Sequence, residues 1–258
     1  MKQYLIRFAK SRAVGVALIV LLLAGWEIGS RLGVRASPNW PPVTRILAAG
    51  FDIIADGSLL SHMFATLRRM FVGYSIAVLL GVTVGTAIGY FRFLYNLFEP
   101  TIELLRPIPS PAYLPLLILF FGIGDLMKIL LIVVATFFPV VLNTYGGIRS
   151  VDPVEIQTAR TFGLRSKAIL KEVAVPAASP QIFTGMRISL AIALIVSILA
   201  EMLAGSNGLG FLIVNAQRTF RAPVVYVIIF ILGLVGYILN RSFLLMERRV
   251  LRWHVAMR

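Results

Sequence analysis

The chain has 258 residues, of which 59% are hydrophobic and only 14% charged, and it contains no cysteine. Soluble domains carry roughly 45–50% apolar and about 25% charged residues, so this composition excludes a soluble globular protein and predicts an integral membrane protein. The missing cysteines exclude a disulfide framework, Cys-ligated zinc and thiol catalysis. The net charge of +14 does not require nucleic acid, because Lys and Arg accumulate in the cytoplasmic loops of membrane proteins.

Apolar segments recur from end to end and predict an all-α protein with six transmembrane helices. A spanning helix needs about 20 mostly apolar residues, because the hydrocarbon core is about 30 Å thick. The first apolar run is too long for a cleaved signal peptide, so we expect it to remain as an anchor. The expected spans are 13–33, 70–91, 107–123, 127–147, 183–204 and 223–243.

We expect a single transmembrane domain over residues 1–258. It would comprise the tail and first helix (1–34), an extracytoplasmic segment (35–69) and the core (70–258). Apolar residues at three- and four-residue spacing over 43–56 predict a short amphipathic helix on the membrane surface. Most of the 25 Lys and Arg residues lie in regions that would share one side, which predicts that both termini are cytoplasmic.

Several residues of the spans suggest specific packing. Gly81, Gly85 and Gly89 lie on one face of the second span and would let another helix approach closely, either within the chain or in a second copy. Glu27 in the first span is expected to pair with Arg31 one turn later. Arg68 and Arg69, at the outer end of the second span, are expected to extend toward the lipid headgroups.

The inner loop 150–180 contains local signals for a helix–glycine–helix hairpin. Asp152 is the expected N-cap, Pro153 the first helical residue, and Glu155 completes the capping arrangement. This helix would run to about Phe162 and stop at a glycine, the usual residue after a helix.

After that glycine, a second short helix is expected at 167–174. Ser166 would cap it, and Pro176 and Pro180 would close the segment before the fifth span. The hairpin leaves apolar side chains that suit docking into a groove on another protein, but they could equally fold back on the chain's own helices. These residues are Val154, Ala159, Phe162, Leu164 and Ile169.

This loop resembles the EAA loop of ATP-binding-cassette (ABC) importer permeases. In that pattern E-A-A is followed by three residues, Gly, nine residues and I-x-L-P. The matching residues here are Gln157, Thr158, Ala159, Gly163 and the segment from Val173 to Pro176, with Gln in place of the usual Glu and Thr in place of Ala. Segments 105–129, 137–148 and 200–213 resemble the nitrate, sulfonate and taurine branch of these permeases.

The resemblance implies a type I ABC importer permease fold with a cytoplasmic coupling hairpin, in the bacterial inner (plasma) membrane. It implies a homodimer of permeases, ABC ATPase subunits that bind ATP and Mg²⁺, and a periplasmic or lipid-anchored solute-binding protein. The chain itself would be non-catalytic and bind no cofactor or metal, and it contains no G-x-x-x-x-G-K-[ST] phosphate loop. The implied ATPase-coupling residues are Glu155, Gln157, Thr158, Ala159, Phe162, Gly163, Leu164 and Pro176.

Three polar residues in the spans are candidates for the pathway or its gate. Asn143 and Arg187 lie near the inner ends of their spans. Glu201, with the glycine-rich segment 206–210, is expected to form part of an outer gate or binding-protein contact, or else to bond exposed backbone. The prolines at the start of the third span predict either a break that lines a cavity or only a boundary.

The expected function is uptake of a small anion, such as a sulfonate, taurine or nitrate. A stand-alone secondary transporter or channel is the alternative, but it does not account for the hairpin. A membrane enzyme or scaffold is a further alternative, and the sequence offers no clustered catalytic residues for it.

Overall fold

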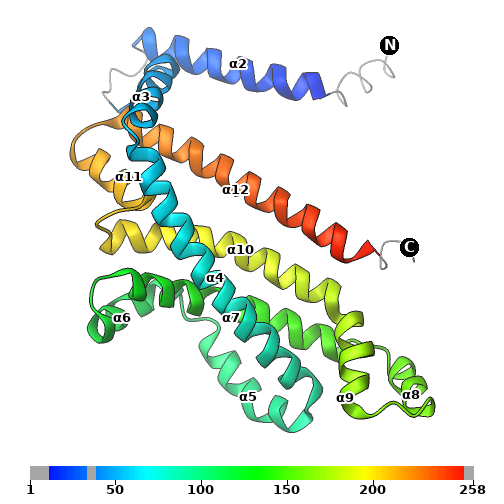
Figure 1. Ribbon diagram of the computed structural model, residues 1–258. Helices are drawn as coiled ribbons and strands as arrows, with labels where there is room; N and C mark the ends of the chain where they lie inside the picture. The colour runs from blue at the N-terminus through cyan, green and yellow to red at the C-terminus, as the bar shows by residue number, and fades with distance from the viewer. Residues whose placement is uncertain (1–11, 34–38, 253–258) are drawn as a thin grey trace, which may run out of the picture. The chain divides into compact units, whose positions relative to one another are not determined.

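The computed structural model describes residues 12–33 and 39–252, and this part of the chain consists of helices and their connections. Figure 1 follows the helices from the N-terminal to the C-terminal end. They are α2 (Arg12–Arg31), α3 (Val43–Ala55), α4 (Ser58–Tyr90), α5 (Arg92–Leu105), α6 (Leu114–Phe121), α7 (Asp125–Arg149), α8 (Pro153–Thr161), α9 (Ser166–Ala168), α10 (Val175–Ala204), α11 (Leu209–Arg218) and α12 (Ala222–Val250), with a 3-10 turn η1 (Ser110–Tyr113) and a π-helical turn η2 (Ile169–Ala174).

The expected second, fourth, fifth and sixth spans coincide with α4, α7, α10 and α12. Among the described residues, four helices are long and apolar enough to cross a membrane, or five if one bent pair counts as a span. Helix α2 covers the first expected span with 20 residues but is not among these four. The count of six therefore stays a prediction. Helix α4 also begins earlier than expected, inside the segment predicted to be extracytoplasmic.

A straight helix over 107–123 does not form. Helix α5 and the η1–α6 segment meet at 91° across the break that contains Pro107 and Pro109. Proline supplies no backbone N–H and disfavours helical geometry in the residue before it, so the helix stops here. The expected third span is therefore replaced by this bent pair of helices.

Internal contacts divide the described residues into two compact units, one within Met1–Ser61 and Leu212–Ile231 and the other within His62–Phe211 and Leu232–Arg258. The prediction of a single transmembrane domain is not tested by this division. Each unit is described by itself below.

The larger unit contains a close, parallel packing of α4 on α7. A Cβ atom built on Gly81 or Gly85 would lie 2.7 Å from a side-chain carbon of α7, which is closer than real contacts allow. The facing pairs are Gly73 with Ile132, Gly81 with Val140, Gly85 with Thr144 and Gly89 with Ile148. The spacing between partners is the same for every pair, so the helices run parallel and in register. The glycine row therefore serves packing within the chain.

Helix α10 packs along α7 in the opposite direction (Figure 1). Ser189 of α10 donates a hydrogen bond of 2.8 Å to the carbonyl of Thr136 on α7. Gly185 lies against Asn143, where an added Cβ would be 2.6 Å from the asparagine Cβ. Small residues bring the two backbones together, as is usual for helices in lipid. Apolar side chains from α4, α6, α7, α10 and α12 form the core around this pair.

The smaller unit contains the expected amphipathic helix, observed as α3. Its buried residues Ile46, Gly50 and Ile53 share one face, and Gly50 faces Val227. In the same unit the expected ion pair between Glu27 and Arg31 is present at 2.6 Å. The helix and the ion pair are therefore confirmed, and the location of α3 on the membrane surface stays a prediction.

Candidate functional site

The first half of the hairpin forms as its local signals predict. The Asp152 side chain accepts a hydrogen bond of 2.8 Å from the backbone N–H of Val154, which caps α8. Helix α8 ends at Thr161, and Gly163 has a φ of +80°. This left-handed conformation is easy for glycine and strained for other residues, so Gly163 sets the turn. The reciprocal bond expected from Glu155 is absent from the described part of the chain.

The second half of the hairpin differs from the prediction. Ser166 is the first residue of α9, and the preceding Arg165 is the N-cap without a side-chain bond. Pro176 and Pro180 do not close the segment, because α9, η2 and α10 follow one another without a break over Ser166–Ala204. Pro180 has no N–H to give the carbonyl of Pro176, and the hydroxyl of Ser179 donates to that carbonyl instead, at 2.7 Å.

The continuous helix ties the hairpin firmly to the body of the larger unit. Ala159 and Ile169 are buried, and the hydroxyl of Tyr90 at the end of α4 donates to the carbonyl of Ser166 at 2.9 Å. Figure 1 shows the hairpin projecting at one end of α7 and α10. The helical segment that follows the Gly163 turn is therefore continuous with α10.

The tip of the hairpin exposes two large apolar side chains. Val154 is 65% exposed and Phe162 79% exposed. Gln157 and Thr158 are exposed beside them, and Leu164 is half-buried. The predicted coupling residues Gln157, Thr158 and Phe162 thus lie on the exposed surface of the hairpin. Ala159 is buried, and Pro176 is part of α10.

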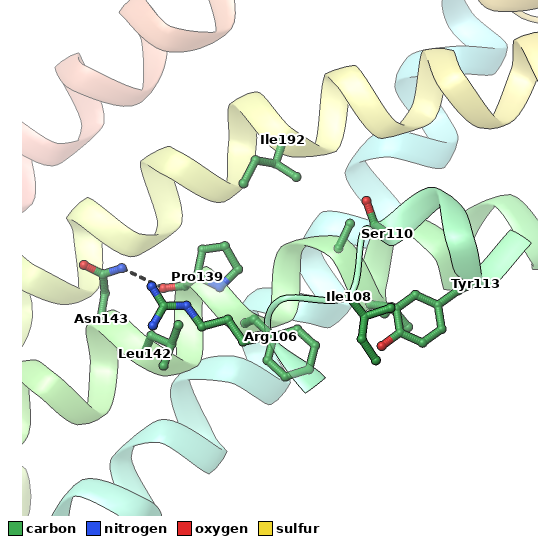
Figure 2. A pocket seen from close by; sticks show the side chains of 11 residues that line it. Arg106, Ile108, Ser110, Tyr113, Pro139, Leu142, Asn143 and Ile192 are labelled. Carbon is green, nitrogen blue, oxygen red and sulfur yellow. Dashed lines mark hydrogen bonds between the residues drawn. The ribbon is translucent and has the colours of Figure 1, made fainter. Parts of the chain in front are cut away.

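A cavity of about 380 Å³ lies beside the bend between α5 and η1 (Figure 2). The predicted pathway residue Asn143 lines it, and its side-chain amide donates to the carbonyl of Pro139 at 2.8 Å. The prolines therefore mark a break that lines a cavity, which was the first of the two expectations for this segment. The other lining residues are Arg106, Ile108, Ser110, Tyr113, Val134, Ala135, Phe138, Pro139, Leu142 and Ile192.

The cationic member of this cavity is Arg106, which the sequence reading did not single out. Figure 2 shows its side chain extending along the cavity toward Asn143. Its ion pair with Glu103, one turn earlier, has a long N–O distance of 3.7 Å. The sequence does contain a signal for Arg106, because it directly precedes the proline break in an apolar segment. At such a break both backbone groups and a charged side chain can face a cavity.

The other two predicted pathway residues lie elsewhere. Arg187 is exposed and donates to the side chain of Asn240 at 3.1 Å, between α10 and α12. Glu201 is 1% exposed and accepts hydrogen bonds from the hydroxyl of Thr66 at 2.8 Å and the N–H of Gly210 at 3.1 Å. Glu201 thus bonds the backbone of the glycine-rich segment, while a role in gating stays a prediction.

Glu201 belongs to a buried charge cluster at the C-terminal end of α10. Arg69 donates to Glu201 at 2.8 Å and to Asp125 at 2.7 Å, and it also bonds the side chain of Asn207. Arg69 is only 2% exposed, so the expectation that it extends to the headgroups is wrong. Its neighbour Arg68 remains more than half exposed and pairs with Asp125. Residues distant in sequence form this cluster, so no local pattern pointed to it.

Known proteins resemble this chain over most of its length. The taurine transport system permease protein TauC of Escherichia coli is 34% identical over 255 residues, covering 96% of this chain and 93% of the relative. The nitrate import permease protein NrtB of a Synechocystis species is 30% identical over 244 residues, covering 91% and 87%. Among solved structures, an inward-facing MetNI methionine ABC transporter superposes with a TM-score of 0.65 at 19% identity, covering 72% of this chain and 93% of the other, which confirms the expected permease fold.

The family described as binding-protein-dependent transport system inner membrane component matches residues 77–252. That range includes α7, the hairpin, α10 and the cavity. The chain therefore belongs to this family of multi-pass inner-membrane proteins and is a permease subunit of an ABC importer.

Proposed function

We propose that the hairpin formed by α8, α9 and η2 is the surface on which a partner ABC ATPase docks. ATP and Mg²⁺ would be bound and used by that partner. Closure of the ATPases would move α8, and the continuous helix into α10 would carry the movement to the helices around the cavity. The chain would thereby couple ATP hydrolysis in its partner to opening and closing of the pathway.

The observation that carries this proposal is the exposure of Phe162 on a firmly anchored turn. A large apolar side chain in water is unfavourable unless it is covered, and 79% of Phe162 is uncovered in the chain alone. Val154 lies on α8 and Phe162 directly follows its last residue, so the two can enter one groove in the helix-in-groove manner. Gln157 and Thr158, two of the coupling residues named from the sequence, are exposed on α8 between them.

The remaining partners follow from the family. A solute-binding protein would deliver the substrate at the outer face, and a second permease copy would complete the pathway. Both termini would be cytoplasmic, on the side of the hairpin. This arrangement would need six spans, with α2 as the first.

The proposed substrate is a small oxyanion. The names of two relatives specify taurine and nitrate, which both carry oxygen-bearing anionic groups. The presence of Arg106 in the cavity supports an anionic ligand, because its guanidinium offers positive charge and N–H donors to anionic oxygen atoms.

Co-purification of the ATPase from native membranes tests the docking surface. We expect Phe162→Ser combined with Val154→Ser to lower the amount of ATPase recovered with the tagged chain about tenfold or more, since buried apolar anchors dominate interface energies. The matched control is Phe93→Ser, because Phe93 on α5 is 74% exposed but lies outside the hairpin. Gly163→Pro, which cannot adopt the positive φ, should cause a similar loss.

Equal recovery of the ATPase with the wild-type chain and the double variant would contradict docking through α8. Failure to recover any ABC ATPase with the wild-type chain, under conditions that preserve complexes, would favour a stand-alone transporter or channel.

A further inference from the structure

The cavity beside the α5–η1 bend has the position expected of a ligand site within a transport pathway. Its α7 residues extend from Val134, near the middle of the helix Asp125–Arg149, to Asn143, closer to its C-terminal end. Discontinuous helices commonly line transporter sites, because the broken helix frees backbone groups that would be unfavourable against lipid. The cavity thus lies along a candidate span and beside a helix break.

The charge of the cavity is set by Arg106. Its side chain is 57% exposed, and its nearest acidic partner, Glu103, lies at 3.7 Å, beyond normal hydrogen-bond length. A guanidinium has five N–H donors in a planar fork, so most of them remain available to a ligand. That fork matches two oxygen atoms of one anionic group better than a lysine ammonium does.

The neutral residue toward which Arg106 extends is Asn143 (Figure 2), and it brings an amide whose second N–H is not used by Pro139. Elsewhere in the cavity lining, Ser110 and Tyr113 carry hydroxyl groups. No aspartate or glutamate is among the residues that line the cavity. Donors therefore outnumber anionic groups, which favours an anion over a cation.

We propose that Arg106 and Asn143 form a binding site for the sulfonate or nitrate group of the transported solute. Arg106 binds two of its oxygen atoms, and the amide of Asn143 binds the remaining oxygen. Its place in transport rests on the proposed function above. Binding of the oxyanion itself can be measured on the permease alone.

The test measures binding of methanesulfonate and of nitrate to the purified full chain in lipid nanodiscs by calorimetry, with chloride holding the ionic strength constant. We expect Arg106→Gln to raise the Kd about tenfold or more, as loss of a charge-assisted pair does. Arg106→Lys should give an intermediate Kd, because it keeps the charge and loses the fork. Glu103→Gln should bind at least as tightly as the wild type.

Arg92→Gln is the matched control, since Arg92 is an exposed arginine at the start of the same helix and does not line the cavity. It should leave the Kd unchanged. Without ligand, each variant must have the same thermal unfolding midpoint as the wild type. If Arg106→Gln has a lower midpoint, the comparison of Kd values uses Arg106→Lys instead.

Binding that is equal in Arg106→Gln and the wild type overturns the proposal, and so does a wild-type chain that binds neither oxyanion. Each of these results leaves ATPase co-purification through the hairpin unaffected. Conversely, loss of the ATPase interaction with intact oxyanion binding would overturn the proposed coupling and leave this site standing.

Discussion

At the residue scale, burial of charge is the feature that most constrains this protein. Arg69 and Glu201 are almost completely buried and bond each other at 2.8 Å. Each carries a desolvation cost that the other offsets, so removal of one partner leaves an uncompensated charge in an apolar environment. The pair fixes the loop after α10 through Asn207, which Arg69 also bonds.

We therefore expect Arg69→Met to destabilise the folded chain by about 3–5 kcal/mol, because Glu201 would remain buried without its cation. The thermal unfolding midpoint in detergent measures the effect. The double variant Arg69→Met, Glu201→Leu should recover much of the loss, since it removes both charges. Arg68→Met is the control and should cost less than about 1 kcal/mol, because Arg68 pairs at the surface. A midpoint for Arg69→Met equal to that of the control would refute this account.

At the element scale, the parallel packing of α4 on α7 depends on the absence of side chains. Four residues of α4 from Gly73 to Gly89 face branched side chains of α7, and Ala77 continues the same face and is fully buried. Thr136, also fully buried, occupies the corresponding position of α7. The row as a whole lets the backbones approach, which gains dispersion contacts where lipid provides no hydrophobic force.

Substitution of Gly85 by Leu should separate the two helices, because even its Cβ would lie 2.7 Å from Thr144 and 2.9 Å from the carbonyl of Val141. Overpacking of this kind costs about 1–3 kcal/mol or more. A lower thermal midpoint and loss of a monodisperse peak in size-exclusion chromatography are the expected results. Gly233→Leu on α12 is the control, since open space surrounds Gly233 within the chain. An unchanged midpoint for Gly85→Leu would contradict the close packing of α4 on α7 described above.

At the scale of the whole molecule, the coupling proposal depends on the orientation of the chain in the membrane. The positive-inside rule predicts that the hairpin lies in the cytoplasm, on the side of an ATPase. The connection between α11 and α12 would then face outward. Phe220 in that connection is 89% exposed and is the described non-glycine residue with a positive φ.

The natural chain has no cysteine, so single cysteines report orientation without background. We expect Phe220→Cys to react with a membrane-impermeant maleimide added to intact cells. Phe162→Cys should react only in inside-out vesicles, because the hairpin would be cytoplasmic. Labelling of Phe162→Cys in intact cells would reverse the assigned orientation and exclude ATPase docking through α8.

Local patterns were sufficient for much of the architecture. The apolar segments predicted α4, α7, α10 and α12, and three- and four-residue spacing predicted α3. Asp152 and Gly163 determined where α8 begins and ends, because a cap and a left-handed glycine act within a few residues. The family resemblance rested on the same hairpin and was confirmed by the match over residues 77–252.

Other features arise from contacts between residues far apart in the chain, and only the tertiary structure decided them. Pro176 and Pro180 read as helix breakers, but the Ser179 hydroxyl satisfies the carbonyl that Pro180 leaves free, and the helix continues. Arg69 read as a surface residue until folding placed Glu201 and Asp125 beside it. The cavity with Arg106 exists because a 91° bend brings η1 against the middle of α7. Hydropathy and spacing determine which segments are helices, whereas the pairing of buried charges and the walls of a cavity depend on which helices meet.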